Sequence, residues 1–403
     1  MRTEKASVAS DAVPASRIEI GVVYFAAMVQ GLALVTFPAA SSIFTRPDGF
    51  GFDSTRYGAM FLPQVVLAVL TSGLAPRLAR RWGLRRVLLL GIVGDIVSMS
   101  LLALSRLLVG APDSAFVVLL VATGCLGMGF GATVMALNTY AEAFFRDRAD
   151  GAVLALNALL GLGTALAPVL VAVVTGMGMW WLLPVVVACV LVLIFAVALA
   201  QPLRGGPAMA RDAQGAISAE ALPHRFWLYA TAVFLYGILE TLNGNWATLY
   251  LTGERGVSPH GASMALAAFW TMVTVGRVLV AAISVRVPAR AMYLALPALL
   301  VITFQLASRV QGEMGGIVAF AMAGLACSAF LPLSISFGGN EFPSLSAVMA
   351  GELISFYQLG YGVAAFATGP LRDLLGLPFS TIFAAASIVA LPLGIIAALI
   401  IRR

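Results

Sequence analysis

The sequence predicts an all-α polytopic membrane protein with twelve transmembrane helices, arranged as two pseudo-symmetric bundles of six. Hydrophobic residues make up 61% of the chain and charged residues only 10%, a balance far from that of soluble domains. Apolar runs of about 20 residues, the length needed to cross a bilayer, follow one another throughout the 403 residues. Features of the first half also recur in the second, which indicates a duplicated six-helix unit.

The order of the runs defines four regions. Residues 1–17 form a polar N-terminal tail, 18–200 the first bundle, 201–225 a polar linker and 226–401 the second bundle. The first apolar run exceeds the roughly 7–15 residues of a signal-peptide core, so we expect a retained helix. The predicted spans are 18–44, 57–79, 87–109, 114–143, 151–176, 179–200, 226–251, 260–284, 290–309, 314–338, 345–371 and 378–401.

Basic residues beside the spans predict the orientation. If both termini and the linker are cytoplasmic, 18 of the 24 lysine and arginine residues lie on that side and 6 outside. This is the positive-inside distribution, which sets membrane topology. We therefore expect a multi-pass protein of the plasma (cytoplasmic) membrane, monomeric and embedded in the lipid bilayer.

The composition also argues against several other classes of function. The net charge of +6 comes from arginines that flank spans, and so gives no sign of a nucleic-acid surface. Lys5 is the only lysine, so no P-loop can follow it. Cys125, Cys189 and Cys327 lie in separate predicted spans and form no metal-binding pattern. We expect no metal, no cofactor and no enzymatic activity.

The seventh span carries polar residues where the middle of the membrane is expected. At about 100° per residue one set falls on a single face, the polar arc: Tyr236, Glu240, Asn243, Trp246 and Tyr250. A carboxylate facing lipid costs about 2.5–3.5 kcal/mol even on the lenient insertion scale, so this face must meet protein or water. It either packs against a neighbouring helix or, as we expect, forms a wall of a substrate pocket, with Glu240 coupling protons to transport.

Other polar residues supply further candidates. Gln30, Asn138 and Gln358 can bind substrate or hydrogen-bond between helices. For Asp95 in the third span we expect a structural pairing with a loop arginine, and a role in proton relay as the alternative. Glu352 either lines the inner vestibule or pairs with an arginine.

The link between the second and third spans reads PRLARRWGLRR from Pro76. It resembles the loop signature G-x-x-x-D-R-x-G-x-R-R of the major facilitator superfamily. The matching residues are Arg81, Gly83, Arg85 and Arg86, whereas Pro76 and Arg80 replace the first glycine and the aspartate. Arg277, after Gly276, resembles the same feature in the second half.

This resemblance implies a carrier that works by alternating access. It also implies a gate in which Glu142 and Glu341, at equivalent ends of the fourth and tenth spans, pair with arginines after the second and eighth spans. The seventh span is most similar to the branch that contains fucose:proton symporters. Across the superfamily, the aspartate that Arg80 replaces here helps to lock the cytoplasmic side of the outward-open state.

We therefore predict a secondary active transporter that moves a small organic solute, with proton-coupled symport of a polar solute such as a sugar. Two alternatives stay open: a proton-coupled exporter of amphipathic compounds, and a non-transporting membrane receptor of the same fold.

Overall fold

The structure is a computed structural model that describes residues 15–203 and 223–402. Most of the predicted tail and linker lie outside these residues. The first half contains α1 (Arg17–Ala39), α2 (Ser41–Thr45), α3 (Ser54–Ala59), α4 (Leu62–Trp82), α5 (Leu84–Leu104), α6 (Pro112–Phe144), α7 (Ala149–Gly176) and α8 (Leu182–Ala200). The second half contains α10 (Phe226–Gly253), α11 (Pro259–Ile283), α12 (Ala289–Ala307), α13 (Gly312–Cys327), α14 (Phe330–Glu341), α15 (Ser346–Asp373) and α16 (Phe379–Ile401).

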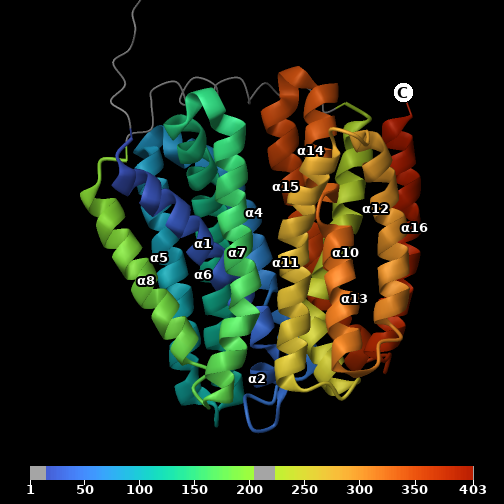
Figure 1. Cartoon of the computed structure of the whole chain (residues 1–403). Helices are drawn as coiled ribbons and strands as arrows, with labels where there is room; N and C mark the ends of the chain where they lie inside the picture. The colour runs from blue at the N-terminus through green and yellow to red at the C-terminus, as the bar shows by residue number, and fades with distance from the viewer. Residues whose placement is uncertain (1–14, 204–222, 403) are drawn as a thin grey trace, which may run out of the picture.

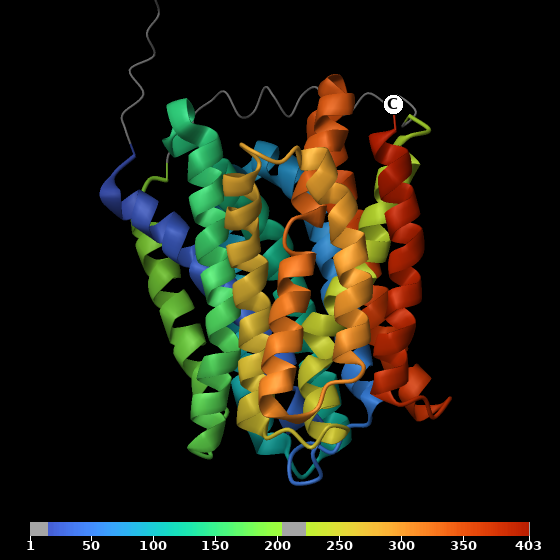
Figure 2. The same ribbon diagram turned by 45° about the vertical axis from the view of Figure 1, so that its right-hand side comes forward.

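The two halves stand side by side with their helices roughly parallel to one long axis (Figure 1). We call the end of the bundle where α1 begins and α16 ends the linker face. The opposite end, which carries α2 and α3, is the distal face. The rotated view shows α11 and α13 in front of the second half, with α7 beside them (Figure 2). Over residues 15–203 and 223–402 the predicted all-helical fold with twelve paths from face to face is confirmed.

Three of the twelve paths are broken, whereas the sequence predicted twelve uninterrupted helices. The breaks separate α1 from α2, α3 from α4, and α13 from α14. Pro63 and Pro332 explain two of them, because proline lacks the N–H that would bond to the carbonyl four residues earlier. For Pro332 that carbonyl belongs to Ser328, which lies in the gap between α13 and α14.

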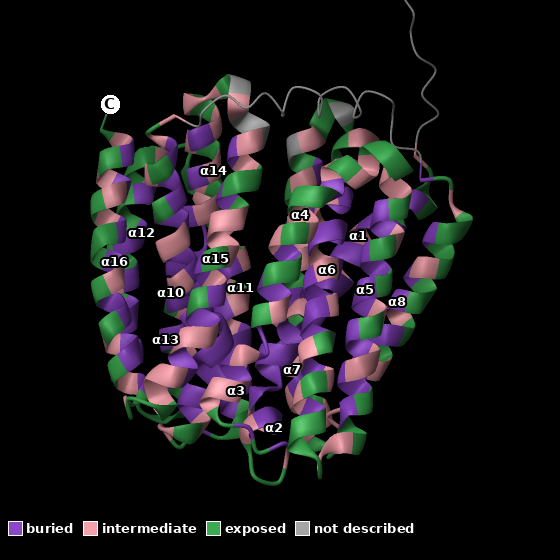
Figure 3. Ribbon diagram, turned by 180° about the vertical axis from the view of Figure 1, so that it is seen from behind, coloured by how far each residue is buried: buried purple, intermediate pink, exposed green. Residues whose placement is uncertain are grey.

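Ten of the described paths are apolar enough to qualify as membrane spans by length and hydropathy, whereas α10 and α15 are not among them. In α10 every residue from Leu239 to Leu251 is buried. The burial-coloured view shows this region as a purple core surrounded by the more exposed helices (Figure 3). Because neighbouring helices shield it from lipid, α10 can carry Glu240 and several amides at membrane depth.

Glycine contacts bring matching helix pairs together in the two halves. A Cβ atom at Gly237 or Gly360 would lie 2.4 Å or 2.0 Å from a backbone carbonyl oxygen of the partner helix, so α10 and α15 touch backbone to backbone. A Cβ atom at Gly31 or Gly163 would likewise lie 2.0 Å or 1.9 Å from a backbone carbonyl oxygen of the partner helix, so α1 and α7 also touch backbone to backbone. Small residues permit such close packing in membranes. The repeated contact supports a duplicated unit.

Candidate functional site

A small cavity of about 60 Å³ lies at the junction of the two halves. The first half lines it with Leu34, Val35 and Pro38 of α1, Gln64 of α4 and Phe130 of α6. The second half lines it with Glu240, Thr241, Gly244 and Asn245 of α10, Trp270 of α11, and Tyr357, Gln358 and Tyr361 of α15. The cavity is much smaller than the roughly 300–1,000 Å³ of typical small-molecule pockets. In this conformation the site is therefore contracted.

Glu240 is the acidic residue of this lining. It is 4% exposed and interacts electrostatically with Arg277 of α11. The hydroxyl groups of Tyr357 and Tyr236 also interact with its carboxyl group. Burial favours the protonated acid, whereas a nearby cation and hydroxyl donors favour the ionised carboxylate. The surroundings of Glu240 thus contain groups that stabilise each of its two forms.

The break between α13 and α14 positions two of these neighbours. Since Pro332 cannot donate to the Ser328 carbonyl, that oxygen accepts a hydrogen bond from Arg277 Nε at 3.2 Å. The carbonyl of Cys327, the last residue of α13, accepts one from the Tyr236 hydroxyl. Neighbouring side chains satisfy backbone groups freed by helix breaks in membranes. Here the same two side chains flank Glu240.

Two polar atoms in the cavity wall lack a hydrogen-bond partner within the described part of the chain. They are Gln64 Oε1, an acceptor, and Trp270 Nε1, a donor. A buried unpaired polar atom costs about 1–3 kcal/mol, so both atoms favour a ligand with complementary polar groups. The neighbouring Asn245 side chain donates to the Tyr361 hydroxyl at 3.0 Å.

Direct contacts between the halves close the distal side of the cavity. The Tyr57 ring meets the Trp246 ring edge to face at 5.1 Å, and its hydroxyl donates to the Asn245 carbonyl at 2.9 Å. Closer to the distal face, Asp373 Oδ2 accepts bonds from the backbone N–H and hydroxyl group of Thr55 at 2.6 Å and 2.8 Å. Thr55 lies in the first turn of α3, so the α15 carboxylate caps a helix of the other half.

The polar arc of the seventh span faces the cavity only through Glu240. Asn243 donates to the Leu239 carbonyl of its own helix at 3.0 Å. Trp246 donates to the Ala364 carbonyl at 3.2 Å, and Tyr250 to the Ala307 carbonyl at 2.6 Å. Tyr236 interacts with Glu240 without lining the cavity. The cavity is lined instead by the adjacent strip of α10, which includes Asn245 and lies off the predicted arc.

Gln30 and Asp95 lie together inside the first bundle. Gln30 Nε2 donates to Asp95 Oδ1 at 3.2 Å, and Gln30 Oε1 accepts from the Thr133 hydroxyl at 2.7 Å. The expected pairing of Asp95 with a loop arginine is wrong: its partner is this amide, because Asp95 is completely buried within the bundle.

The remaining amides divide between the cavity and helix packing. Gln358 lines the cavity, as expected for a substrate-binding residue. Asn138 accepts a hydrogen bond from Asn157 at 3.2 Å, which joins α6 to α7. Glu352 is exposed near the linker face.

The signature residues between α4 and α5 lie at the linker face. Gly83 has φ = +89°, a conformation that glycine adopts without strain. Arg85 donates to the Ala198 carbonyl at 3.3 Å and also to the Leu199 carbonyl, at the end of α8. Arg81 and Arg86 are exposed.

The two gate glutamates differ in their surroundings. Glu341 pairs with Arg225, at the start of α10, and accepts a hydrogen bond from Tyr229 at 2.8 Å. Arg277, within α11, donates to the Ser328 carbonyl and interacts with Glu240. Glu142 is exposed and also makes an interaction.

Sequence reasoning missed Gln64, Trp270, Tyr357 and Tyr361 as cavity residues. The spacing of Tyr357 and Tyr361 on one face of α15 was a usable signal, since residues four apart on a helix are neighbours. The polar atoms of Gln64 and Trp270 gave no such pattern in the sequence.

Twelve helical paths in two repeated halves, with a cavity at their junction that contains buried polar groups, are the architecture of a secondary transporter. The chain belongs to the Major Facilitator Superfamily, whose family model matches residues 22–351. Among curated protein sequences, none matches this chain.

Solved structures share the fold at low sequence identity. The nucleoside transporter NupG has a TM-score of 0.74 at 13% identity, covering 96% of this chain and 100% of that one. The E. coli fucose:proton symporter FucP has a TM-score of 0.64 at 13% identity, covering 96% and 99%. The peptide transporter POT, in complex with sulfate, has a TM-score of 0.70 at 15% identity, covering 95% and 94%. The predicted family is confirmed, and a fucose:proton symporter is among the matches.

Proposed function

We propose that this protein is a proton-coupled symporter of a small polar solute that contains a ring, such as a sugar or a nucleoside. The observation that carries the proposal is the position of Glu240 in the cavity wall, between Arg277 and two tyrosine hydroxyls. Polar atoms of Gln64 and Trp270 that lack partners in the described structure supply an acceptor and a donor for hydroxyl groups. The Trp270 and Tyr361 rings supply aromatic surface of the kind that ligand pockets use.

The proposed cycle uses Glu240 as the proton carrier. A proton and the solute enter while the cavity is open to one side, and neutral Glu240 then leaves Arg277 free to keep its bond to Ser328. When the cavity opens to the other side, water and Arg277 stabilise the ionised carboxylate and the proton departs. The similarity in fold to a fucose:proton symporter and a nucleoside transporter supports the solute class.

We further propose that the linker face is cytoplasmic and that the structure is closed toward the outside. The arginine distribution supports the orientation. The contacts of Tyr57 with Trp246 and of Thr55 with Asp373 support closure of the distal face. In this orientation the signature arginines and Glu142 and Glu341 lie at the cytoplasmic end, where they are positioned to bias the conformational equilibrium as a gate.

Uptake by proteoliposomes with an imposed pH gradient tests the proposal. A thermal-shift screen of sugars and nucleosides first identifies a ligand that stabilises the purified protein. With that ligand, Glu240→Gln should lose accumulation driven by the pH gradient while retaining solute exchange. Glu352→Gln, an exposed carboxyl on α15, is the matched control and should accumulate normally. Accumulation by Glu240→Gln equal to that of the wild type would overturn proton coupling through this residue.

A further inference from the structure

A proline leaves one carbonyl free at the break between α13 and α14, close to Glu240. Pro332, the third residue of α14, has no N–H to donate to the Ser328 carbonyl. The next residue, Leu333, does donate to its own acceptor, the Ala329 carbonyl, at 3.0 Å. The break thus provides a single free acceptor on the side that faces α11.

The donor that occupies this acceptor is the arginine that interacts with Glu240. Arg277 Nε donates to the Ser328 carbonyl at 3.2 Å. Gly276, the residue before it, lets α11 lie directly against the break, because a Cβ atom there would lie 2.5 Å from both the Cβ and the Oγ atom of Ser328. Small residues permit such contacts between membrane helices. The Arg277 side chain therefore begins beside the free carbonyl.

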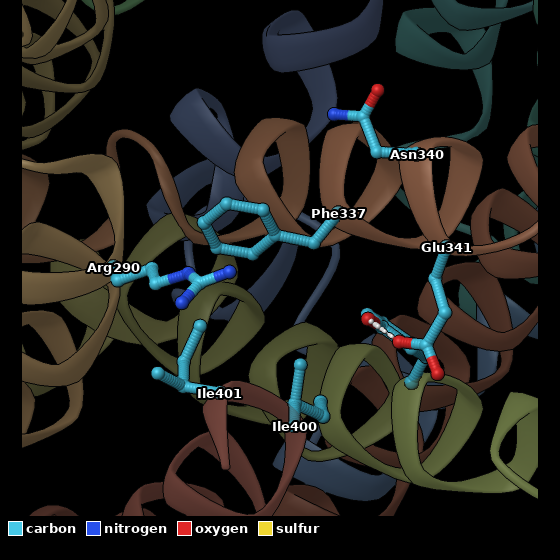
Figure 4. A pocket seen from close by; sticks show the side chains of 7 residues that line it. Arg290, Phe337, Asn340, Glu341, Ile400 and Ile401 are labelled. Carbon is cyan, nitrogen blue, oxygen red and sulfur yellow. Dashed lines mark hydrogen bonds between the residues drawn. The ribbon is translucent and has the colours of Figure 1, made fainter. Parts of the chain in front are cut away.

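Both ends of α14 are anchored, so the free carbonyl keeps its position. Near the break, the Phe330 and Tyr293 rings stack with their centroids 4.6 Å apart, and the Tyr293 hydroxyl is hydrogen-bonded to Ser334 at 2.9 Å. At the linker face, Glu341 points from the end of α14 toward α10 and accepts a hydrogen bond from Tyr229 at 2.8 Å (Figure 4). A change at the break itself can then be made without releasing the rest of the helix.

Four titratable groups interact with Glu240 within the described structure. They are Tyr236 of α10, Arg277 of α11, Cys327 of α13 and Tyr357 of α15. Only Arg277 among them is positively charged at neutral pH. Arg277 and Glu240 nevertheless form no ion pair within 4.0 Å in the part of the chain that the structure describes. The bond to the free carbonyl holds the guanidinium close to Glu240 but out of direct contact with it.

We propose that Pro332 is a positioning residue for proton coupling, because it frees the carbonyl that keeps Arg277 from pairing directly with Glu240. An arginine in direct contact with a carboxyl group favours its ionised form, so a permanent pair would oppose loading of the proton. With Arg277 held at Ser328, the neutral acid forms in the closed cavity. Ionisation then draws the guanidinium to the carboxylate, because a hydrogen bond between charged partners is stronger than one to a neutral carbonyl. This inference rests on the proposed role of Glu240.

Pro332→Ala tests the positioning role, because alanine supplies the N–H that Ser328 lacks and so releases Arg277. Pro332 is exposed, so the substitution removes little packing. Infrared spectroscopy of the purified full chain in lipid follows the titration of Glu240, as the carboxyl C=O band that is absent from Glu240→Gln. We expect the midpoint of this band in Pro332→Ala to fall about 1–3 pH units below that of the wild type, the effect of a cation placed next to a carboxylate.

Two further variants make the test specific. Pro392→Ala makes the same change at an exposed proline inside α16 and should titrate as the wild type does. Pro332→Ala combined with Arg277→Gln should lose the downward shift, because the shift requires the arginine. A shift that persists in this double variant would overturn the positioning role, as would equal midpoints for Pro332→Ala and the wild type. A wild-type Glu240 band that does not respond to pH would instead overturn the proposed function itself.

Discussion

The hydrogen-bond partner of Asp95 is determined by packing inside the first bundle and could not be read from the sequence. Its side chain is completely buried, Oδ1 accepts from Gln30, and Oδ2 has no partner within the described part of the chain. A buried carboxylate without a cation is costly, so a neutral group suits this position better than a charged one. No pattern in the sequence favours an amide over a loop arginine as its partner.

We therefore predict that Asp95→Asn folds as stably as the wild type, with a free energy of unfolding within about 1 kcal/mol, because the amide keeps the bond to Gln30. Asp95→Leu should cost about 1–3 kcal/mol, since it leaves Gln30 Nε2 buried without an acceptor. Thermal midpoints in the same detergent measure both. A large fall in the thermal midpoint of Asp95→Asn would mean that the negative charge of Asp95 is required for stability.

Arg277 and Glu240 provide a residue-scale test of the site. Removing Arg277 leaves the Glu240 carboxylate without its cation, whereas removing both charges does not. We predict that Arg277→Gln lowers the thermal midpoint more than the double variant Arg277→Gln with Glu240→Gln. A double-mutant cycle should give a coupling of about 0.5–3 kcal/mol. Strict additivity would show that the two side chains act independently.

At the scale of elements, the sequence predicted where α10 runs and that it carries an interior carboxyl, but not which strip of it meets the cavity. Helical-wheel reasoning assumes that one polar face points inward and the other surfaces meet lipid. From Leu239 to Leu251, α10 is instead buried all round. Its polar side chains can then satisfy backbone carbonyls on several sides, as those of Asn243 and Trp246 do, and only packing selects the cavity strip.

The contact of α10 with α15 leads to an element-scale prediction. Gly360→Ala places a Cβ atom 2.0 Å from the Phe234 carbonyl oxygen, so the helices must move apart. We expect a loss of about 1–3 kcal/mol, the usual cost of overpacking. On the same helix, a Cβ atom at Gly351 meets nothing within 4 Å. Gly351→Ala should therefore be neutral or stabilising by up to about 1 kcal/mol, and equal thermal midpoints for the two variants would contradict the close contact.

At the scale of the whole molecule, twelve spans and a repeated unit were predictable because hydropathy and composition act over long stretches of chain. The relative placement of the halves was not, since it depends on contacts between residues hundreds of positions apart. Tyr57 with Asn245 and Thr55 with Asp373 are such contacts. In the proposed cycle these contacts break each time the distal face opens, so they can differ in free energy from the open state by only a few kcal/mol.

Asp373→Asn tests how strongly the contact between Thr55 and Asp373 favours the closed distal face. The amide keeps an acceptor for Thr55 but loses the charge at the start of α3, so closure of the distal face should weaken by about 0.3–1 kcal/mol. Distance distributions between spin labels placed across the distal face, in nanodiscs, should shift toward the longer population. As the matched control, Asp48→Asn removes a carboxylate that pairs with Arg46 in the same loop region. A shift of equal size in that control would assign the effect to surface charge in general.

The polarity of α10 also bears on how the chain is made. A translocon releases segments into lipid according to their hydrophobicity, and a segment with a central carboxylate and several amides is released poorly on its own. Both α10 and α15 are less apolar than the other paths, and they pack on each other. We therefore expect α10 to enter the lipid only after later helices of the second half have been made. A nascent chain that ends soon after Gly253 should therefore integrate its first six spans but leave the seventh uninserted, so that a cysteine placed at Gly253 reacts with an impermeant thiol reagent from the same side as the linker.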